Sequence, residues 1–363
     1  MKRETRLKLK QLLVIIITWL FIGFVMSVYD HLVIHTADSG GAVESYSFSF
    51  LLVRNMAGGL IGALLGGSFL VFFVNVRYSD KPYGYTILAV SISYLLVFAF
   101  IMVVLGSILV PVKTGRPLSD PVSREALVNF FTDSAPLKSA IAWSFVVAFT
   151  QLLLQVNSKF GQEAFWNIIR GRYNTPKSER KVFMFLDLNA STTIAERLGD
   201  ERYHKLLKDF FADITDPIIE NKGEIYQYVG DEVIVAWKEA DGVENSQCVK
   251  CFFDIKLHIE RMHQKYISRY GLLPSFKAGI HYGHVIAGEI GIVKRDITYS
   301  GDVLNTTSRI QATCKELNKD VLISSDLASK LQLAEPYGVM PLGSIKLKGK
   351  DRELQLLSIV RTN

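Results

Sequence analysis

Four side chains in the second half of this sequence have the chemistry needed to act together on a phosphate group. Asn305 and Arg309 stand four residues apart at the start of a stretch with helical character. This spacing places an amide and a guanidinium on one face of a helix. Asp187 and Asp231 supply carboxylates of the kind that hold magnesium on a nucleotide. Carboxylates for a metal ion, with an amide and an arginine for developing negative charge, indicate phosphoryl chemistry.

Both aspartates lie where short strands are predicted to end or turn. Residues 181–188, KVFMFLDL, predict a buried strand ending at Asp187, and residues 223–237 predict two strands about a turn that contains Asp231. A strand end and a neighbouring turn can bring two carboxylates together, and a close pair repels unless a cation lies between them. Either aspartate alone is explained as a turn or cap residue. Their combination with the amide and guanidinium favours a metal site.

The first half of the chain predicts a helical membrane domain. Hydrophobic residues make up 49% of the 363 residues and are concentrated before about residue 157. Four apolar runs are each long enough to cross roughly 30 Å of hydrocarbon; they cover residues 12–28, about 56–76, about 85–110 and about 140–156. We therefore expect an N-terminal segment 1–11, four transmembrane helices within 12–157, a linker 158–180 and a soluble α+β domain 181–363.

The predicted spans carry features of an anchor. Gly58, Gly62 and Gly66 repeat every four residues, a small-residue row that lets membrane helices approach closely. The runs lack the intramembrane carboxylates and interrupted helices that mark ion pathways, which argues against a transporter or channel. We interpret this half as an anchor and dimerisation surface that can also act as a sensor.

Charge places the soluble half in the cytoplasm. The formal net charge is +6, and basic residues cluster at the amino terminus and again after the fourth run, in residues 159–181. Basic clusters beside spans mark the cytoplasmic side and attract anionic lipid, whereas the loop 30–46 has no lysine or arginine. We expect a multi-pass protein of the plasma (inner) membrane. The soluble half has no basic stripe interleaved with aromatic residues, so we do not expect nucleic-acid binding.

Several reactive residue types are predicted to have ordinary structural roles. Cys248 and Cys251 form a CxxC pair inside a helical pattern, without a second pair or histidines at zinc spacing. His281 and His284 have no predicted metal-binding companions and are expected to be neutral strand histidines. Strand alternation predicts that Glu232 points to the face away from the metal aspartates.

Four motifs in order resemble the catalytic domain of class III nucleotidyl cyclases, over residues 181–360. They are FLDLNASTTIAERLG, QYVGDEV, GIHYGHVIAGEIG continuing into KRDITYSGDVLNTTSRI, and KLKGK. The resemblance implies an α+β fold with a ferredoxin-like βαββαβ core. It also implies a dimer in which one subunit supplies the metal aspartates and its partner the asparagine and arginine, so a homodimer would have two equivalent sites and a monomer would be inactive.

The resemblance assigns a role to each site residue. Asp187 and Asp231, with the backbone carbonyl of Leu188, would bind two magnesium or manganese ions, one of which lowers the pKa of the ribose 3′-hydroxyl. Asn305 would position the ribose, and Arg309 would stabilise charge on the α-phosphoryl group. Lys348 would hold the terminal phosphates, with Lys350 as a second candidate.

The same resemblance indicates which purine nucleotide is the substrate. In this family ATP users usually have a lysine four residues before the second metal aspartate, with an aspartate or threonine in the later hairpin, whereas GTP users have glutamate and cysteine. Thr298 fits adenine, whereas Gln227 is neither the lysine nor the glutamate of these patterns. Because a glutamine amide can both donate and accept hydrogen bonds, it can serve either purine. We expect ATP as substrate and cyclic AMP and pyrophosphate as products. A guanylate or mixed-specificity cyclase, and a membrane receptor with an inactive nucleotide-binding domain, are the alternatives.

Two segments depart from the pattern or leave their role open. Ala190 and Ser191 stand where a glycine and a phenylalanine are usual, and alanine is tolerated if the backbone there keeps φ negative. The linker FGQEAFWNIIRGRYNTPKSER predicts a short amphipathic helix, which either couples the membrane domain to the catalytic dimer or is a passive spacer. The apolar residues of that helix are Phe165, Trp166, Ile168 and Ile169.

Overall fold

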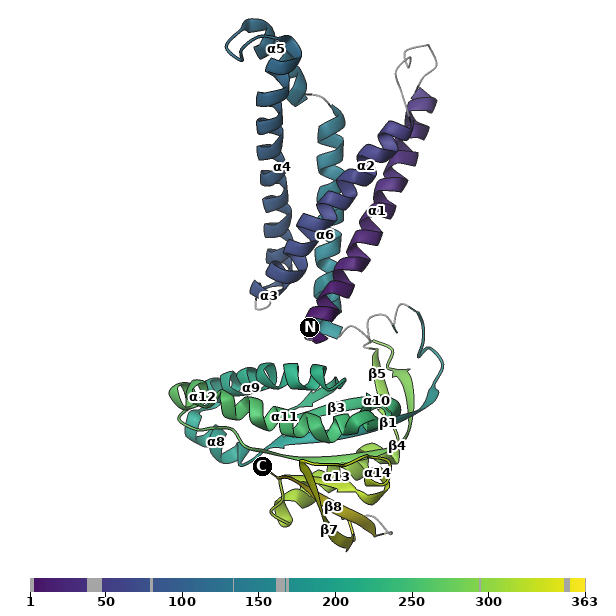
Figure 1. The fold of residues 1–363 in the computed structure, drawn as a ribbon, viewed down its shortest axis with the longest axis vertical. Coiled ribbons are helices and arrows are strands. Elements are labelled where there is room, and N and C mark those ends of the chain that lie inside the picture. The colour runs from purple at the N-terminus through teal and green to yellow at the C-terminus, as the bar shows by residue number, and fades with distance from the viewer. Residues whose placement is uncertain are drawn as a thin grey trace. The chain divides into compact units, whose positions relative to one another are not determined.

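The protein is described by a computed structural model that forms two compact units (Figure 1). One unit comprises Thr5–Trp166, and the other comprises Met1–Glu4 with Asn167–Asn363. We describe each unit by itself. The residues that the structure describes are 3–37, 48–78, 81–132, 134–160, 167, 170–293, 295–348 and 353–362.

The first unit is helical and confirms the predicted membrane helices. Its described part contains four segments long and apolar enough to span a membrane: Thr5–Val33, Leu51–Arg77, Tyr83–Thr114 and Pro121–Lys159. The elements are α1 (Arg3–Ala37), α2 (Phe48–Gly62), the π-helical segments η1 (Ala63–Gly67) and η2 (Leu70–Val74), α3 (Asn75–Arg77), α4 (Tyr83–Thr114), α5 (Pro121–Thr132) and α6 (Ser134–Phe160).

Glycines allow α1 and α2 to cross at close range, but not the glycines that the sequence singled out. A Cβ built on Gly59 would lie 2.9 Å from the carbonyl oxygen of Trp19, and one on Gly23 would lie 2.9 Å from that of Asn55. Gly58, in the predicted row, has no such neighbour within 4 Å. The close contact therefore uses the position next to the predicted row.

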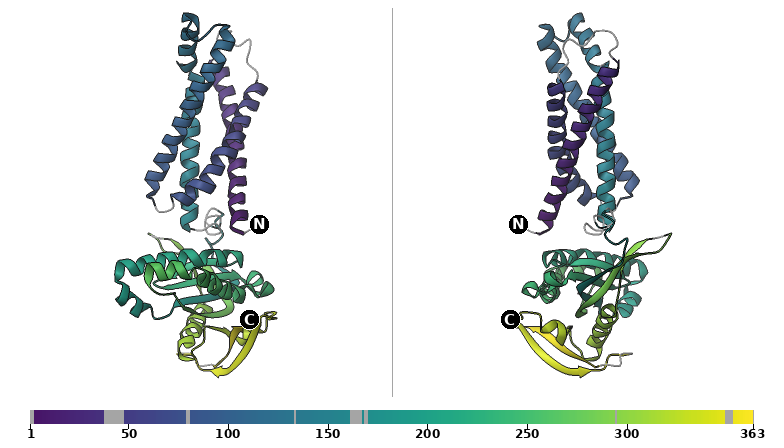
Figure 2. Two further views of the ribbon diagram at one scale, coloured as in Figure 1. Left: turned by 60° about the vertical axis from the view of Figure 1, so that its left-hand side comes forward. Right: turned by 90° about the vertical axis from the view of Figure 1, so that its right-hand side faces the viewer.

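The second unit is an α+β domain built on one mixed sheet. Strand order is β2-β3-β1-β4-β6-β8-β7, with β5 paired to β4, and the β7–β8 pair forms one end of the sheet (Figure 2). The strands are β1 (Lys177–Leu188), β2 (Glu224–Val229), β3 (Glu232–Lys238), β4 (Phe276–Ile290), β5 (Asp296–Ser300), β6 (Val321–Ser324), β7 (Tyr337–Ile345) and β8 (Leu354–Arg361).

Helices cover both faces of this sheet (Figure 1). The order β1, helix, β2, β3, helix, β4 is the predicted βαββαβ core. The helices are α8 (Ser191–Leu198), α9 (Asp200–Glu220), α10 (Glu239–Val243), the 3₁₀ turn η3 (Glu244–Ser246), α11 (Gln247–Arg261), α12 (His263–Tyr270), α13 (Asp302–Glu316) and α14 (Ser325–Ala328).

Alternation along β1 assigns its two faces. Val182, Met184, Leu186 and Leu188 are fully buried in the main core against α9 and α11. The residues between them face the other way, where Phe183 and Phe185 join a smaller cluster with residues of β3, β4 and α13. Because side chains alternate along a strand, Asp187 belongs to this second face, at the end of β1.

Two helical stretches of this domain are divided, and one strand is long. Helices α8 and α9 are separated at Gly199, where φ is +74°, and α11 and α12 are separated at Met262. Strand β4 continues to Ile290 because β1 pairs with it from Phe276 to Ala287 and β5 pairs with its last residues.

Gly279 on β4 sets how closely α13 packs on the sheet. A Cβ at this position would lie 2.4 Å from the backbone nitrogen of Gln311 and 2.8 Å from the carbonyl oxygen of Thr307. Both atoms belong to α13. Only a residue without a side chain allows this approach, so Gly279 fixes the height of α13, the helix that carries Asn305 and Arg309.

Candidate active site

Asp187 and Asp231 come together at one end of the sheet. Asp187 lies near the end of β1, and Asp231 lies in the turn that joins β2 to β3, the strand paired with β1. Burial raises the pKa of the Asp187 carboxyl, and the negative charge of Asp231, within hydrogen-bonding reach, raises it further. Two carboxylates this close repel when both are ionised. A divalent cation bound by oxygen ligands removes this repulsion, so the pair fits such an ion.

Glu232 lies on the same face as Asp187, contrary to the sequence expectation. The two residues are directly opposite each other on the paired strands β1 and β3, and directly opposite residues share a face. Burial, then the charges of Asp187 and Asp231, raise the pKa of Glu232 to about 7. The described residues nevertheless contain no group of three or more His, Cys, Asp or Glu side chains that could hold a metal ion. Glu232 therefore adds negative charge beside Asp187 and Asp231 without completing a three-carboxylate metal cluster among the described residues.

Helix α13 of the same chain places two further side chains on Asp187. The Gln311 amide nitrogen donates a hydrogen bond to Asp187 Oδ2 at 3.3 Å, and Lys315 Nζ lies 3.2 Å from the same oxygen. The sequence analysis missed both residues. The available signal was their four-residue spacing, which puts them on one face of the predicted helix. What the sequence lacked was the packing that aims that face at β1.

Asn305 and Arg309 lie earlier on α13 and do not contact these carboxylates. Asn305 is exposed and Arg309 is half-buried. Neither side chain has a hydrogen bond or ion pair to any residue that the structure describes. Within one chain, the first half of α13 therefore presents a free amide and a free guanidinium, and the second half contacts Asp187.

The predicted purine residues lie on β2 and β5. Gln227 is exposed on β2, and Thr298 is half-buried on β5, opposite Gly288. The Oγ1 atom of Thr298 is buried and has no hydrogen-bond partner among the described residues. Neighbouring tyrosines join the two strands: the backbone nitrogen of Tyr299 donates to the Tyr226 hydroxyl at 3.2 Å. No bond joins Gln227 and Thr298 within the described parts of this chain.

Other predicted positions have definite places in the domain. Lys348 is exposed just after β7, whereas Lys350 lies outside the described residues, as does most of the predicted linker helix. His281 Nδ1 is 2.7 Å from the Ser324 hydroxyl oxygen, and His284 Nε2 accepts a hydrogen bond from Arg180 Nε at 2.9 Å. These contacts give both histidines structural partners.

The turn after Asp187 adopts a conformation that the sequence analysis did not expect. Ala190 has φ +55° and ψ +33°, in the left-handed region. This conformation costs a non-glycine residue about 1–2 kcal/mol. Alanine therefore replaces the usual glycine with φ positive, and the backbone of this turn is strained three residues after Asp187.

This sheet, with paired carboxylates at the end of β1 and in the β2–β3 turn, defines a nucleotidyl cyclase domain. Residues 174–358 match the model of the adenylate and guanylate cyclase catalytic domain, and the chain belongs to this family. It is 38% identical over 207 residues to adenylate cyclase 2 of Rhizobium meliloti (strain 1021), covering 57% of each chain. It is 24% identical over 196 residues to an adenylate cyclase of Anabaena cylindrica, covering 50% of this chain and 37% of that one.

Solved structures share the fold. A bacterial light-regulated adenylyl cyclase superposes with a TM-score of 0.54 at 20% identity, covering 64% of this chain and 68% of that one. The chain covers little more than half the length of the Rhizobium relative and less of the Anabaena one. The shared region is the cyclase domain, so the activity and assembly of the whole protein are matters for proposal.

Proposed function

We propose that this protein is a membrane-anchored adenylate cyclase that converts ATP to 3′,5′-cyclic AMP and pyrophosphate. The observation that carries the proposal is the approach of Asp187 to Asp231, which raises the pKa of Asp187. A half-buried pair of close carboxylates is unfavourable without a cation, and a nucleoside triphosphate arrives with one. Family membership and the adenylate cyclase relatives support the same assignment.

Each site residue then has a task. Asp187, Asp231 and the backbone carbonyl of Leu188 would hold two divalent ions, magnesium or manganese. When bound, such ions neutralise the triphosphate and lower the pKa of the ribose 3′-hydroxyl. Arg309 stabilises charge on the α-phosphoryl group with its planar fork of donors, as pyrophosphate leaves. Asn305 orients the ribose so that the 3′-oxygen attacks in line, and Lys348 binds the terminal phosphates.

We further propose that the working unit is a homodimer with two equivalent sites. In one chain Gln311 and Lys315 already contact Asp187, while the side chains of Asn305 and Arg309 have no partner among the described residues. The exposed amide of Asn305 and the half-buried guanidinium of Arg309 are available to a nucleotide held by the other protomer. A two-fold dimer in which each protomer supplies half of each site gives this arrangement.

The purine assignment rests on Thr298. Its buried hydroxyl oxygen lacks a partner within the described chain, and a buried polar atom gains from a hydrogen bond supplied by substrate. The amide of Gln227 can serve either purine, so GTP is the second candidate substrate. The four apolar segments and flanking basic residues support a plasma-membrane location with the catalytic domain in the cytoplasm.

The first experiment identifies the product. Full-length protein in detergent is supplied with ATP or GTP and magnesium or manganese, and the nucleotide products are separated by chromatography. We expect cyclic AMP as the main product. A clear preference for GTP would overturn the purine assignment, and nucleotide binding without any product would favour the receptor alternative.

Complementation tests the shared site. Asp187→Ala and Arg309→Ala variants should each be inactive, because each lacks one half of both sites. When they are co-expressed, one site of each mixed dimer is intact, and roughly a quarter of wild-type activity should return. Asp326→Ala, at an exposed carboxylate on α14, is the control and should keep full activity. Mixed dimers that form without recovering activity would exclude sites shared between protomers.

A further inference from the structure

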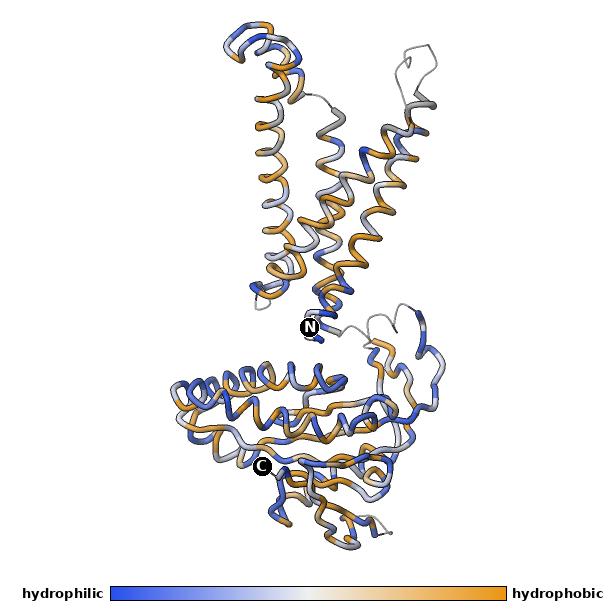
Figure 3. The backbone as a smooth tube through the Cα atoms, viewed as in Figure 1, coloured by the Kyte–Doolittle hydropathy of each residue, from blue (hydrophilic) through white to orange (hydrophobic). Residues whose placement is uncertain are grey.

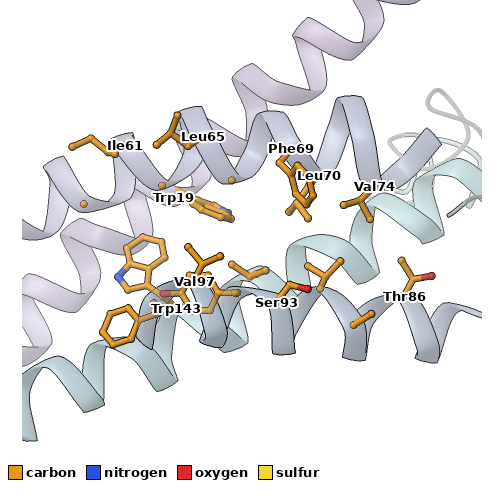
Figure 4. Close-up of a pocket in the computed structure, with 18 of the residues that line it drawn as sticks. Trp19, Ile61, Leu65, Phe69, Leu70, Val74, Thr86, Ser93, Val97 and Trp143 are labelled. Atoms are coloured by element: carbon orange, nitrogen blue, oxygen red, sulfur yellow. The ribbon is translucent and has the colours of Figure 1, made fainter. Parts of the chain in front are cut away.

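The second membrane span is deformed beside a cavity. Two π-helical segments, η1 and η2, interrupt this span, and π-helical turns are rare and occur frequently at functional sites. A cavity of about 690 Å³ lies against them. Its other walls are α4, Trp19 of α1, and Trp143 and Val147 of α6 (Figure 4). All of these elements belong to the membrane unit.

The glycine row predicted to pack helices together forms one wall of this cavity. Gly58, Gly62 and Gly66 all line it. A Cβ on Gly58 would meet nothing within 4 Å, and one on Gly62 or Gly66 would meet only the Trp19 ring, at 3.4 and 3.7 Å. The row therefore faces open space and one indole. The cavity has space at this wall because its three glycines have no side chains.

The lining is mostly apolar, with hydroxyl groups from Tyr78, Thr86, Ser93 and Tyr94, and it is uncharged. Among the described residues that surround the cavity, none carries a charge. The Trp19 indole nitrogen donates to Thr150 at 3.0 Å, and the Thr86 hydroxyl donates to the Pro82 carbonyl at 3.3 Å, so these polar groups are already satisfied. The rings of Trp19 and Trp143 lie 5.5 Å apart. Such a lining favours an apolar, uncharged occupant over a phosphate or carboxylate.

The cavity is elongated and of the size that small molecules occupy. On α4 the lining runs from Thr86 to Phe98, a length of about 18 Å at 1.5 Å per residue. Pockets for small molecules range over about 300–1,000 Å³. The cavity matches one elongated small molecule.

We propose that this cavity binds one uncharged, elongated, apolar molecule that is dissolved in the bilayer. The π-helical segments, the glycine wall and the two indoles form the binding site. No cationic side chain among the described lining residues is available to hold a phosphate head group inside the cavity, which favours an uncharged molecule over a whole phospholipid.

The test uses the fluorescence of the two lining tryptophans. Full-length protein in phosphatidylcholine nanodiscs is titrated with 1-bromododecane, a linear uncharged quencher. We expect quenching that saturates at low mole fraction and is reversed by unbrominated dodecane. Ala89→Leu fills the cavity from α4 and should raise the midpoint by about tenfold or more, or abolish saturation. Ala99→Leu, the same change at an exposed non-lining position of α4, should behave as wild type.

Two further arms decide the outcome. Gly62→Leu fills the cavity from the opposite wall and should reproduce the effect of Ala89→Leu, so misfolding of one variant does not stop the test; circular dichroism checks each fold. Phosphatidylcholine with brominated chains replaces bromododecane in the second arm. Equal saturable quenching by brominated phospholipid would show that bulk lipid fills the cavity and would overturn the proposal. Quenching that is linear, or unaffected by both filling variants, would overturn it as well.

Discussion

The two units of this chain bury their apolar residues to very different extents. In the cyclase unit Phe183, Phe210 and Trp237 are fully buried in the core. In the membrane unit Phe100 and Phe145 are 68% and 73% exposed on the outer surface of the helices. Orange predominates along the membrane helices with little blue, whereas orange and blue alternate through the second unit (Figure 3). The hydrophobic effect in water drives the tight packing of the cyclase core. Lipid gives no such drive, so a cavity persists in the membrane unit.

The largest expected effect is at the tightest contact of the cyclase unit. Gly279→Ala puts a Cβ 2.4 Å from the backbone of α13, so the helix must move away from the sheet. We expect a loss of about 3 kcal/mol, a fall in Tm of roughly 6–12 °C and loss of most cyclase activity. Thermal unfolding and product assays measure both. Unchanged stability would show that α13 does not pack as described.

A second comparison replaces one buried indole in each unit. Trp237 donates to the Asn221 carbonyl at 2.8 Å in the cyclase core, and Trp19 donates to Thr150 at 3.0 Å in the membrane unit. Trp237→Phe leaves a buried acceptor unpaired and should cost about 1–3 kcal/mol. Trp19→Phe should cost only about 0.6 kcal/mol, the average for bonds between membrane helices. Hydrogen exchange of peptides from each unit reports the two losses separately. Equal losses would remove the contrast between the units.

Neighbouring glycines in the membrane unit test where its helices touch. Gly59→Ala introduces a methyl group 2.9 Å from the Trp19 carbonyl oxygen and should cost about 1 kcal/mol, at the low end for overpacking, because helices in lipid can separate. Gly58→Ala enters open space and should be neutral or stabilising by up to about 1 kcal/mol, because alanine favours the helix. Hydrogen exchange in peptides from α1 measures both. The reverse order would restore the packing role that the sequence predicted for Gly58.

The smallest expected effect concerns a solvated charge in the otherwise tightly packed unit. Lys315 lies 3.2 Å from Asp187 Oδ2, and its side chain is 56% exposed. Lys315→Met removes a cation that competes for this carboxylate. Manganese affinity, measured by electron paramagnetic resonance without nucleotide, should rise by no more than about fivefold, as for exposed ion pairs.

A matched control for Lys315→Met is available on α11. Lys256→Met removes a comparable pair with Asp320, 2.7 Å apart, which belongs to no proposed site. Manganese affinity should not change in this variant. If Lys315→Met lowers the affinity, Lys315 helps to form the metal site rather than competing for it.

The sequence predicted most of the cyclase fold because the strands and helices of a domain in water have a polar exposed face and an apolar buried face. Alternation from Val182 to Leu188 shows which side of β1 is buried, and the turn containing Asp231 follows from its glycine. Strand register was not available from the sequence, so Glu232 was placed on the wrong face. The contacts of Gln311 and Lys315 were missed because they depend on how α13 packs against β1.

In the membrane unit the sequence predicted less. Length and hydropathy identify the spans, but residues apolar on all sides do not show which face meets another helix. The glycine row therefore indicated close packing where the structure has a cavity. The left-handed conformation of Ala190 was also beyond prediction, because the surrounding fold imposes it against the local preference of alanine.

Strand β1 begins at Lys177 and carries Asp187 ten positions further along, in a stretch that pairs with β3 on one side and with β4 on the other. Sliding this strand by one residue would turn Asp187 into the hydrophobic core, since successive side chains face opposite ways. A signal that arrives through the linker therefore cannot act by sliding β1 along its neighbouring strands. Such a signal must instead rotate the cyclase domain as a rigid body. In the proposed homodimer, this rotation would change the interface between the two cyclase domains while Asp187 keeps its position in each sheet.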